Sequence, residues 1–177
     1  WYYLSASSGA MQTGMITVYG KNYILQDSGV MLSKTGWVQY QGNWYYMYSD
    51  GHVFHGGWLK VSNKWYYMDT ETGMMKKGWL KTSGKYYYLN SSGVMQTGWQ
   101  KINGSWYYLG PVGDGAMRKN QWVDDSYLGS DGKMMTACWV DDYYVGISGK
   151  ITKNQWVQDY YAGADGKKLK NQWIDDS

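Results

Sequence analysis

The sequence is poor in several features that define common protein classes. It has a single cysteine, Cys138, which excludes an intrachain disulfide and leaves the redox compartment open. It has one proline, Pro111, and one phenylalanine. No apolar run approaches the roughly eighteen residues that a membrane-spanning helix needs, and no signal peptide is visible. The sequence therefore predicts neither a disulfide framework nor a membrane span.

The chain also lacks a large excess of positive or negative charge. The net charge is +3, and both signs are scattered along the chain. Nucleic-acid binding needs clustered Lys and Arg to displace counterions from phosphates, so no nucleic-acid partner is predicted. Glu71 is the only glutamate, and it has no carboxylate partner nearby in the sequence.

Tryptophan, tyrosine and glycine are abundant instead. The chain has 12 Trp, 20 Tyr and 24 Gly in 177 residues. Disordered tracts are poor in aromatic residues, so we reject disorder. Trp and Tyr carry an apolar body and a polar tip, which suits half-exposed positions. The rings could form a core, or some could stay open to a ligand.

These aromatic residues recur at fixed intervals. A Trp follows Gly at spacings of 21, 21 and 20 residues, at Trp37, Trp58, Trp79 and Trp99. A second aromatic residue comes seven positions after each, at Trp44, Trp65, Tyr86 and Trp106. From Trp122 the period shortens to 17, through Trp139, Trp156 and Trp173. The sequence is therefore a run of small repeats.

The change of period predicts three segments. Residues 1–110 contain repeats of about 20–21 residues, residues 111–121 form a bridging bend, and residues 122–177 contain the 17-residue repeats. The chain opens on "WYYL" and stops at "WIDDS", both partial repeats, so we expect a piece of a longer protein.

Each repeat has the pattern of a β-hairpin. A β-rich run, a Gly/Asn/Asp turn and a second β-rich run recur, while helical periodicity is absent. A single two-stranded hairpin is only marginally stable in water, so such units must stack on their neighbours. The predicted fold class is all-β: a solenoid of stacked β-hairpin repeats without one central core.

The stretch "GWVQYQGNWYYM" shows which rings share a face. A two-residue turn at Gln41–Gly42 would place Trp37 and Trp44 on one face and Val38 and Tyr45 on the other, because side chains alternate along a strand. The two indoles then form two walls of a pocket.

The next hairpin can supply a third wall through Tyr66. Three aromatic walls suit a quaternary ammonium, which is attracted to ring faces by about 0.5–2 kcal/mol per ring. A neutral sugar would need planar stacking and converging polar groups instead.

The pattern resembles the choline-binding repeat, also called the cell-wall-binding repeat. Residues 1–110 carry the resemblance, and "GVMQTGWQKINGSWYYL" matches it almost letter for letter. The resemblance implies a left-handed superhelix of hairpins, secreted and attached to the cell surface. Its implied partner is choline or phosphocholine on teichoic or lipoteichoic acid, with no cofactor, and a homodimer is left open.

The resemblance also implies cages of two Trp, one Tyr from the next hairpin and often a Met. By position, the cages are Trp37, Trp44, Tyr66 and Phe54; Trp58, Trp65, Tyr87 and Met75; Trp79, Tyr86, Tyr107 and Met95; and Trp1, Tyr23 and Met11. Because Tyr86 replaces a Trp, its cage is expected to bind more weakly. Trp99 and Trp106 give two walls, with Ser126 as third partner by alignment, or Tyr127 if the chain shifts.

Other repeats depart from the pattern. Met15 and Asn22 stand at the two Trp positions of a degenerate copy, so its interface with Tyr45 is expected to hold no ligand. The short repeats have lost the second Trp. We expect them mainly to extend or cap the array, or to bind through a different constellation.

The sequence gives little indication of a catalytic or metal site. His52 and His55 lack a Cys or acidic cluster to complete a coordination sphere. The pairs at residues 124–125, 141–142 and 175–176 offer two carboxylates each, as glycosidases need, but they recur where Asp is a favoured turn residue. Cys138 has no His/Asn constellation near it in the sequence.

We therefore expect a non-catalytic binding module, with any enzyme or adhesin outside these residues. An α-glucan or other carbohydrate-binding repeat is the alternative, since it also uses recurring Trp/Tyr hairpins. A structural spacer or oligomerisation stalk comes third, and a catalytic domain last.

Overall fold

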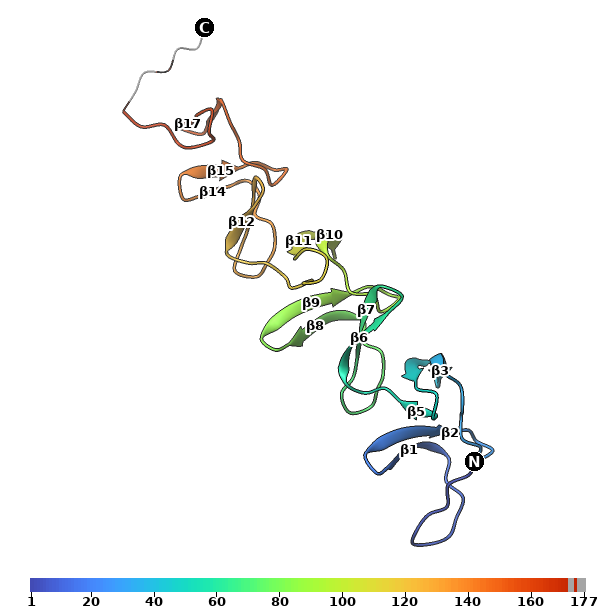
Figure 1. Cartoon of the computed structure of the whole chain (residues 1–177). Helices are drawn as coiled ribbons and strands as arrows, with labels where there is room; N and C mark the ends of the chain where they lie inside the picture. The colour runs from blue at the N-terminus through green and yellow to red at the C-terminus, as the bar shows by residue number, and fades with distance from the viewer. Residues whose placement is uncertain (172–173, 175–177) are drawn as a thin grey trace. The chain divides into compact units, whose positions relative to one another are not determined.

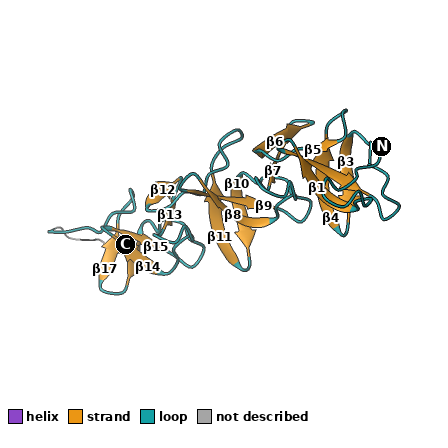
Figure 2. Cartoon of the chain, turned by 90° about the horizontal axis from the view of Figure 1, so that it is seen from below, coloured by secondary structure: helices purple, strands orange, loops and turns teal. Residues whose placement is uncertain are grey.

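The structure of the chain is a computed structural model that describes residues 1–171 and residue 174. Among these residues all regular structure is β-strand, as Figure 2 shows in orange. Strands follow one another as hairpins from the blue to the red end of Figure 1. The predicted fold class, an all-β protein of stacked hairpin repeats, is confirmed. Trp173 and the Asp pair at 175–176 lie outside the described residues.

Within the described residues, the strands form eight hairpins and one short additional strand. The hairpins are β1 (Gly14–Val18) with β2 (Lys21–Leu25), β3 (Gly36–Tyr40) with β4 (Asn43–Met47), β6 (Gly57–Val61) with β7 (Lys64–Met68), β8 (Gly78–Thr82) with β9 (Lys85–Leu89), β10 (Gly98–Ile102) with β11 (Ser105–Leu109), β12 (Gln121–Val123) with β13 (Ser126–Leu128), β14 (Cys138–Val140) with β15 (Tyr143–Val145), and β16 (Gln155–Val157) with β17 (Tyr160–Ala162). The additional strand is β5 (His52–Val53). Hairpin strands have five residues before residue 110 and three residues after it.

The described chain divides into two compact units. Unit 1 contains Trp1–Leu80 and Tyr88–Met95. Unit 2 contains Lys81–Tyr87 and the described residues from Gln96 onward. The hairpin β8–β9 therefore contributes residues to both units.

Tight turns set the register of the hairpins. Gln41 and Gly42 both have positive φ, 46° and 76°, which is the backbone of a type I′ turn and matches the twist of paired strands. The register that the sequence predicts follows: Trp37 pairs with Tyr46, and Gln39 with Trp44. In the short hairpins Asp124 takes a φ of 52°, a conformation that Asp tolerates, and the predicted turn at 124–125 is confirmed.

The hydrophobic core is distributed, with one fully buried residue at the end of each second strand. These residues are Leu25, Met47, Met68, Leu89, Leu109, Leu128, Val145 and Ala162. A cluster of buried residues in unit 1 joins the first two hairpins through Ile24, Val38, Tyr45, Met47 and Val53. The first two hairpins thus bury apolar surface on each other, as neighbouring units of repeat proteins do.

The connection after each hairpin folds back toward the hairpin before it. After β4 it forms β5, which pairs with β2 of the first hairpin and with β4 of the second. After β7, the Met75 N–H donates to the Trp44 carbonyl of the preceding hairpin at 2.8 Å, while Met75 bridges Met68 of its own. This return decides which residues meet at a pocket.

Candidate functional site: aromatic pockets between hairpins

The best-formed predicted site lies between hairpins β3–β4 and β6–β7 of unit 1. Its lining residues define pocket A, a cavity of about 390 Å³: Trp37, Trp44, Tyr66, Met75, Lys77, Ser91 and Ser92. The three predicted aromatic walls are therefore brought together. None of these seven residues is acidic, so the pocket offers ring faces and a thioether to a ligand.

The aromatic walls are held by strand geometry and by ring contacts. Trp37 lies edge-on to its strand partner Tyr46, with 5.4 Å between ring centroids, and to Tyr66 of the next hairpin, at 4.7 Å. Trp44 keeps 37% of its surface exposed. Edge-to-face contacts between aromatic rings are individually favourable. Trp37 and Tyr66 are thus fixed, and Trp44 is accessible to solvent.

The thioether of pocket A differs from the prediction. The sequence assigns Phe54 to this position, but the structure places Met75 there. Phe54 packs against Tyr48 instead, with 5.9 Å between ring centroids. The physical reason is the folded-back connection, which brings the Met that follows the Tyr-donating hairpin to the preceding Trp pair. The sequence spacing does not say to which hairpin a connection returns.

A glycine on the next connection holds Met75 in place. Gly93 has a φ of +78°, a conformation that favours glycine. A Cβ at Gly93 would lie 2.4 Å from the Met75 Sδ. The Gly-x-Met pattern therefore has a packing cause: the glycine leaves room for the Met of the preceding connection.

Polar side chains lie at pocket A beside the rings. Lys77, Ser91 and Ser92 line it and are exposed. Within residues 1–171, Lys77 makes no salt bridge. An ammonium and two hydroxyls can bind an anionic oxygen, such as that of a phosphate. Sequence reasoning missed these three residues because they fall in connections rather than in the aromatic pattern.

The second and third predicted cages draw residues from both units. In unit 1, Trp58 and Trp65 have ring centroids 6.4 Å apart, and the Met95 N–H donates to the Trp65 carbonyl at 2.8 Å. In the cage of Trp58 and Trp65, Met95 therefore takes the place that the sequence predicts for Met75. In unit 2, the Met117 N–H makes the same bond to the Tyr86 carbonyl, at the position assigned to Met95.

The remaining members of these two cages are divided between the units. Trp79 is in unit 1, whereas Tyr86, Tyr87 and Tyr107 are in unit 2. Both cages therefore stay predictions.

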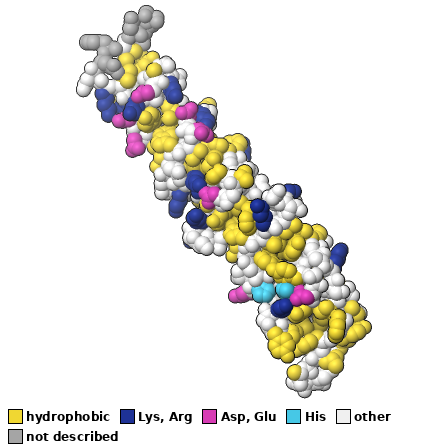
Figure 3. All heavy atoms as spheres, viewed as in Figure 1, with side chains coloured by type: hydrophobic (Ala, Val, Ile, Leu, Met, Phe, Trp, Pro, Cys, Tyr) yellow, Lys and Arg dark blue, Asp and Glu magenta, His cyan; other side chains and the backbone are white. Residues whose placement is uncertain are grey.

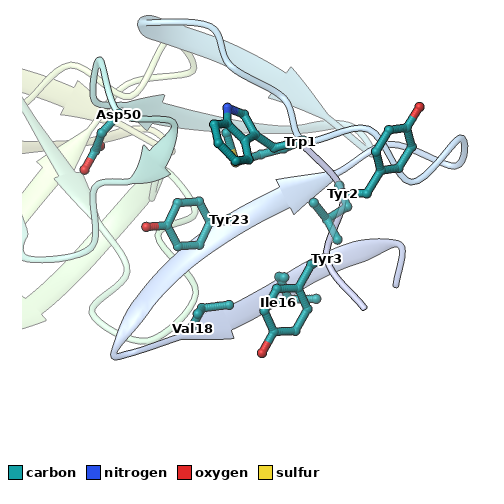
Figure 4. Close-up of a pocket in the computed structure, with 9 residues that line it drawn as sticks. Trp1, Tyr2, Tyr3, Ile16, Val18, Tyr23 and Asp50 are labelled. Carbon is teal, nitrogen blue, oxygen red and sulfur yellow. The ribbon is translucent and has the colours of Figure 1, made fainter. Parts of the chain in front are cut away.

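The predicted cage at the amino end forms pocket B, of about 420 Å³. It is lined by Trp1, Tyr2, Tyr3, Ile16, Val18, Tyr23, Leu25, Met31 and Asp50. Figure 4 shows Trp1 and Tyr23 on opposite sides of it, with Tyr2 turned away.

Pocket B differs from the prediction at its thioether. Met31, whose N–H donates to the Trp1 carbonyl at 2.8 Å, takes the place predicted for Met11. Met11 reaches Gly29 instead, where its Sδ would lie 2.2 Å from an added Cβ. The folded-back connection is again the reason.

Asp50 contributes a carboxylate to the lining of pocket B, and the Lys21 ammonium is paired with it. Hydrogen bonds from the Lys21 ammonium, 3.0 Å away, and then from His52 lower the pKa of Asp50 to about 2. The carboxylate is therefore ionised throughout the physiological range.

The predicted pair Trp99 and Trp106 lies in pocket C of unit 2, of about 270 Å³. Its lining residues are Trp99, Trp106, Ser126, Met134, Ser148 and Lys150. Ser126, the partner by alignment, takes the third place, and Tyr127 instead contacts Trp122 of its own hairpin at 5.1 Å. The Lys150 ammonium lies 5.7 Å from the Trp99 ring centroid. Pocket C thus lacks a phenol wall and contains a cation of the chain.

The interface between β1–β2 and β3–β4 is closed. Asn22, at a Trp position, is buried and donates to the Glu71 carbonyl at 2.8 Å, while accepting from the Thr17 hydroxyl at 2.7 Å. Tyr45 is 5% exposed and belongs to the core, against which Met15 packs. Burial raises the pKa of the Tyr45 hydroxyl. The space that indoles line in pocket A is filled here by the protein.

The His, Asp and Cys candidates take structural positions. His52 pairs with Asp50 and lies 4.3 Å from the Tyr48 ring centroid. The Asp residues at 124–125 and 141–142 occupy hairpin turns. Cys138 begins strand β14 and pairs with Val145. Within the described part of the chain, no cluster of three or more His, Cys, Asp or Glu residues could hold a metal.

Stacked hairpins with aromatic pockets between them define a class of repeat proteins that bind ligands at hairpin interfaces. Sequence profiles of choline-binding repeats match residues 76–122, 116–151 and 150–177, and a cell wall binding repeat matches residues 35–52 and 56–71. The chain belongs to the choline-binding repeat family. No curated protein matches it in sequence.

Solved structures from Streptococcus pneumoniae are similar to this chain. Choline binding protein F is 36% identical, with a TM-score of 0.72 over 86% of this chain and 54% of that one. CbpJ is 34% identical, with a TM-score of 0.73 over 86% and 55%. The choline-binding domain of CbpL is 29% identical, with a TM-score of 0.51 over 92% of this chain and 100% of that one.

The match differs in extent between these relatives. The chain spans about half the length of choline binding protein F and CbpJ, but all of the CbpL domain. Among the described residues, no helix has the length and apolar character to cross a membrane.

Proposed function

We propose that this chain is a non-catalytic attachment module that binds choline groups of cell-wall teichoic acids. Proteins of its family are associated with the Gram-positive cell wall, which supports a secreted, surface-attached module. The observation that carries the proposal is pocket A, where Trp37, Trp44 and Tyr66 surround one cavity beside the Met75 thioether.

The chemistry of pocket A fits a trimethylammonium group. Ring faces attract the cation, and the apolar walls accept its methyl groups without requiring a hydrogen bond. A quaternary ammonium has no N–H to satisfy, so pocket A needs no acidic acceptor to bind it. Lys77 and the two serines lie beside the rings, where the phosphate of phosphocholine could be bound.

Several pockets on one chain would raise the affinity for a polymer. Each ring contributes about 0.5–2 kcal/mol, so a single pocket binds weakly. Pockets A and B contain at least two aromatic residues each and lie in one unit. A polymer that carries many choline groups can engage them together, which raises avidity by about 10²–10⁴ where geometry allows.

A titration with choline, followed by tryptophan fluorescence, tests this function. We expect a saturable response that weakens roughly two- to thirtyfold in Trp44→Ala, the cost of one ring. Trp156→Ala is the matched control, because Trp156 is an exposed indole that lines none of the three pockets. A response to dextran alone would support the glucan alternative, and no response to either ligand would leave the spacer.

A further inference from the structure

In unit 2, one hairpin interface contains an ammonium supplied by the chain itself. Trp139 of β14 and Tyr160 of β17 have ring centroids 5.8 Å apart, with planes at 84°. The Lys168 Nζ lies 2.8 Å from the Tyr160 ring centroid and 5.3 Å from that of Trp139. One cation therefore contacts two rings from consecutive hairpins.

This pair of rings corresponds to part of pocket A. Trp139 pairs with Tyr144 within its hairpin, as Trp37 pairs with Tyr46. The phenol of the next hairpin then approaches the first indole in both interfaces, as Tyr66 does in pocket A. The short interface thus keeps two of the three aromatic walls.

Lys168 takes the backbone position of the pocket methionine. Its N–H donates to the Asp142 carbonyl at 2.8 Å, as the Met75 N–H donates to the Trp44 carbonyl. It bridges Ala162 at the end of its own hairpin, as Met75 bridges Met68. The substitution therefore brings an ammonium to the place where pocket A has a thioether.

The surroundings of Lys168 leave the rings as its partners. The residue is half-buried, and within residues 1–171 it makes no salt bridge. The nearby acid, Asp142, is paired with Lys170 at 3.0 Å. An ammonium without an acidic partner is stabilised by aromatic ring faces, and the more so where it is partly shielded from water.

We propose that the Trp139–Tyr160 interface is a cation site that the chain fills with its own Lys168 ammonium. While Lys168 is present, the site is closed to external cations. Replacing its side chain with an uncharged one turns the interface into a two-ring site for a quaternary ammonium. Tyr160 is 42% exposed, so its ring face is open to solvent once the Lys168 ammonium is removed.

The test is a titration with tetramethylammonium chloride, followed by the indole N–H signals of Trp139 and Trp44 in ¹H–¹⁵N spectra. Sodium chloride at equal ionic strength is the salt control. The variant is Lys168→Met, which introduces the residue found at this position in pockets A and C. Lys168→Arg keeps a cation, and Lys170→Ala removes a neighbouring exposed lysine.

The Trp139 signal is expected to respond in Lys168→Met, with an affinity on the order of tenfold weaker than that of pocket A because one ring is missing. It should stay unchanged in the wild type, Lys168→Arg and Lys170→Ala. An equal Trp139 response in the wild type, or none in Lys168→Met, would overturn the proposal. If Lys168→Met does not fold, Lys168→Gln is judged by the same signals. The Trp44 signal reports pocket A separately, so failure of one proposal is distinguishable from failure of the other.

Discussion

The first two hairpin interfaces of unit 1 both have a connection that folds back onto the preceding hairpin, but only the second contains an open pocket. Between β1–β2 and β3–β4, the phenol of the following hairpin, Tyr45, is 5% exposed and belongs to the core. Between β3–β4 and β6–β7, the corresponding Tyr66 lines an open cavity. The first interface has Asn22 where the second has Trp44. The hairpin frame therefore does not decide whether an interface contains an open cavity.

The side chains at two positions make the difference. The indoles of Trp37 and Trp44 form walls of the cavity of pocket A. Met15 and Asn22 are smaller, and Asn22 satisfies its buried amide through Thr17 and Glu71. A closed interface contributes stability, whereas an open one gives up burial of ring surface for a ligand.

The largest expected effect separates these two contributions. Asn22→Ala removes a buried amide and its two part-buried hydrogen bonds, to the Glu71 carbonyl and from the Thr17 hydroxyl. At about 0.5–1.5 kcal/mol for each bond, this should cost about 1–3 kcal/mol in the free energy of unfolding. Urea denaturation measures it. Choline affinity at pocket A should fall less than in Trp44→Ala, because Asn22 does not line that pocket and is linked to it only through the Glu71 carbonyl of the connection that carries Met75. Trp44→Ala should show the reverse pattern, and parallel losses in both variants would contradict the distinction.

A glycine substitution sharpens the open side of the comparison. Gly93→Ala adds a Cβ that would lie 2.4 Å from the Met75 Sδ, so the thioether must leave its position and choline affinity at pocket A should fall several-fold. Calorimetric titration measures the change. Gly20→Ala is the matched control: its φ of +76° carries the same strain, but its Cβ meets nothing within 4 Å. Equal losses of choline affinity in Gly93→Ala and Gly20→Ala would show that backbone strain, and not contact with Met75, causes the loss.

The smallest expected effect is a fall in choline affinity at acidic pH. Asp69 anchors the connection that carries Met75, and its pKa is held below the ordinary value by the Lys76 ammonium, 2.7 Å away, and then by the Thr72 N–H. Because the folded pKa is lowered, this stabilisation is present above the unfolded value and is lost as pH falls toward the folded value.

Choline affinity at pocket A should therefore stay constant from pH 7 to about 4 and fall by on the order of twofold below that. Fluorescence titrations across this range measure it. Asp69→Asn lacks the charge at every pH, so its affinity should be lower at neutral pH and insensitive to acid. A wild-type affinity that falls above pH 5 would point to another group.

Much of the fold could be predicted from the sequence because its signals are local. The turn at Gln41–Gly42 fixes the register, and the register fixes the shared face of Trp37 and Trp44. Period and stacking then place Tyr66 opposite them. These steps need only strand alternation and a two-residue turn.

The assignments that failed depend on long-range pairing. Phe54 and Met11 were expected in pockets that Met75 and Met31 occupy, because only the paired backbone shows that a connection returns to the preceding hairpin. Lys168 was missed for the same reason: its position is recognisable only after its bond to the Asp142 carbonyl is known.

Both hydrophobic and charged side chains reach the surface of the molecule, with apolar patches interrupted by scattered charges (Figure 3).

The residues that line pocket A extend along the sequence from Trp37 to Ser92, a span of more than two repeats. A single copied repeat thus carries the indoles of one pocket and the phenol of the pocket before it. Duplication of one repeat would supply a further pair of indoles and a phenol, but not the connection residues corresponding to Ser91 and Ser92. A protease cut after Met68 would separate the Met75 thioether from the indoles that lie upstream of the cut.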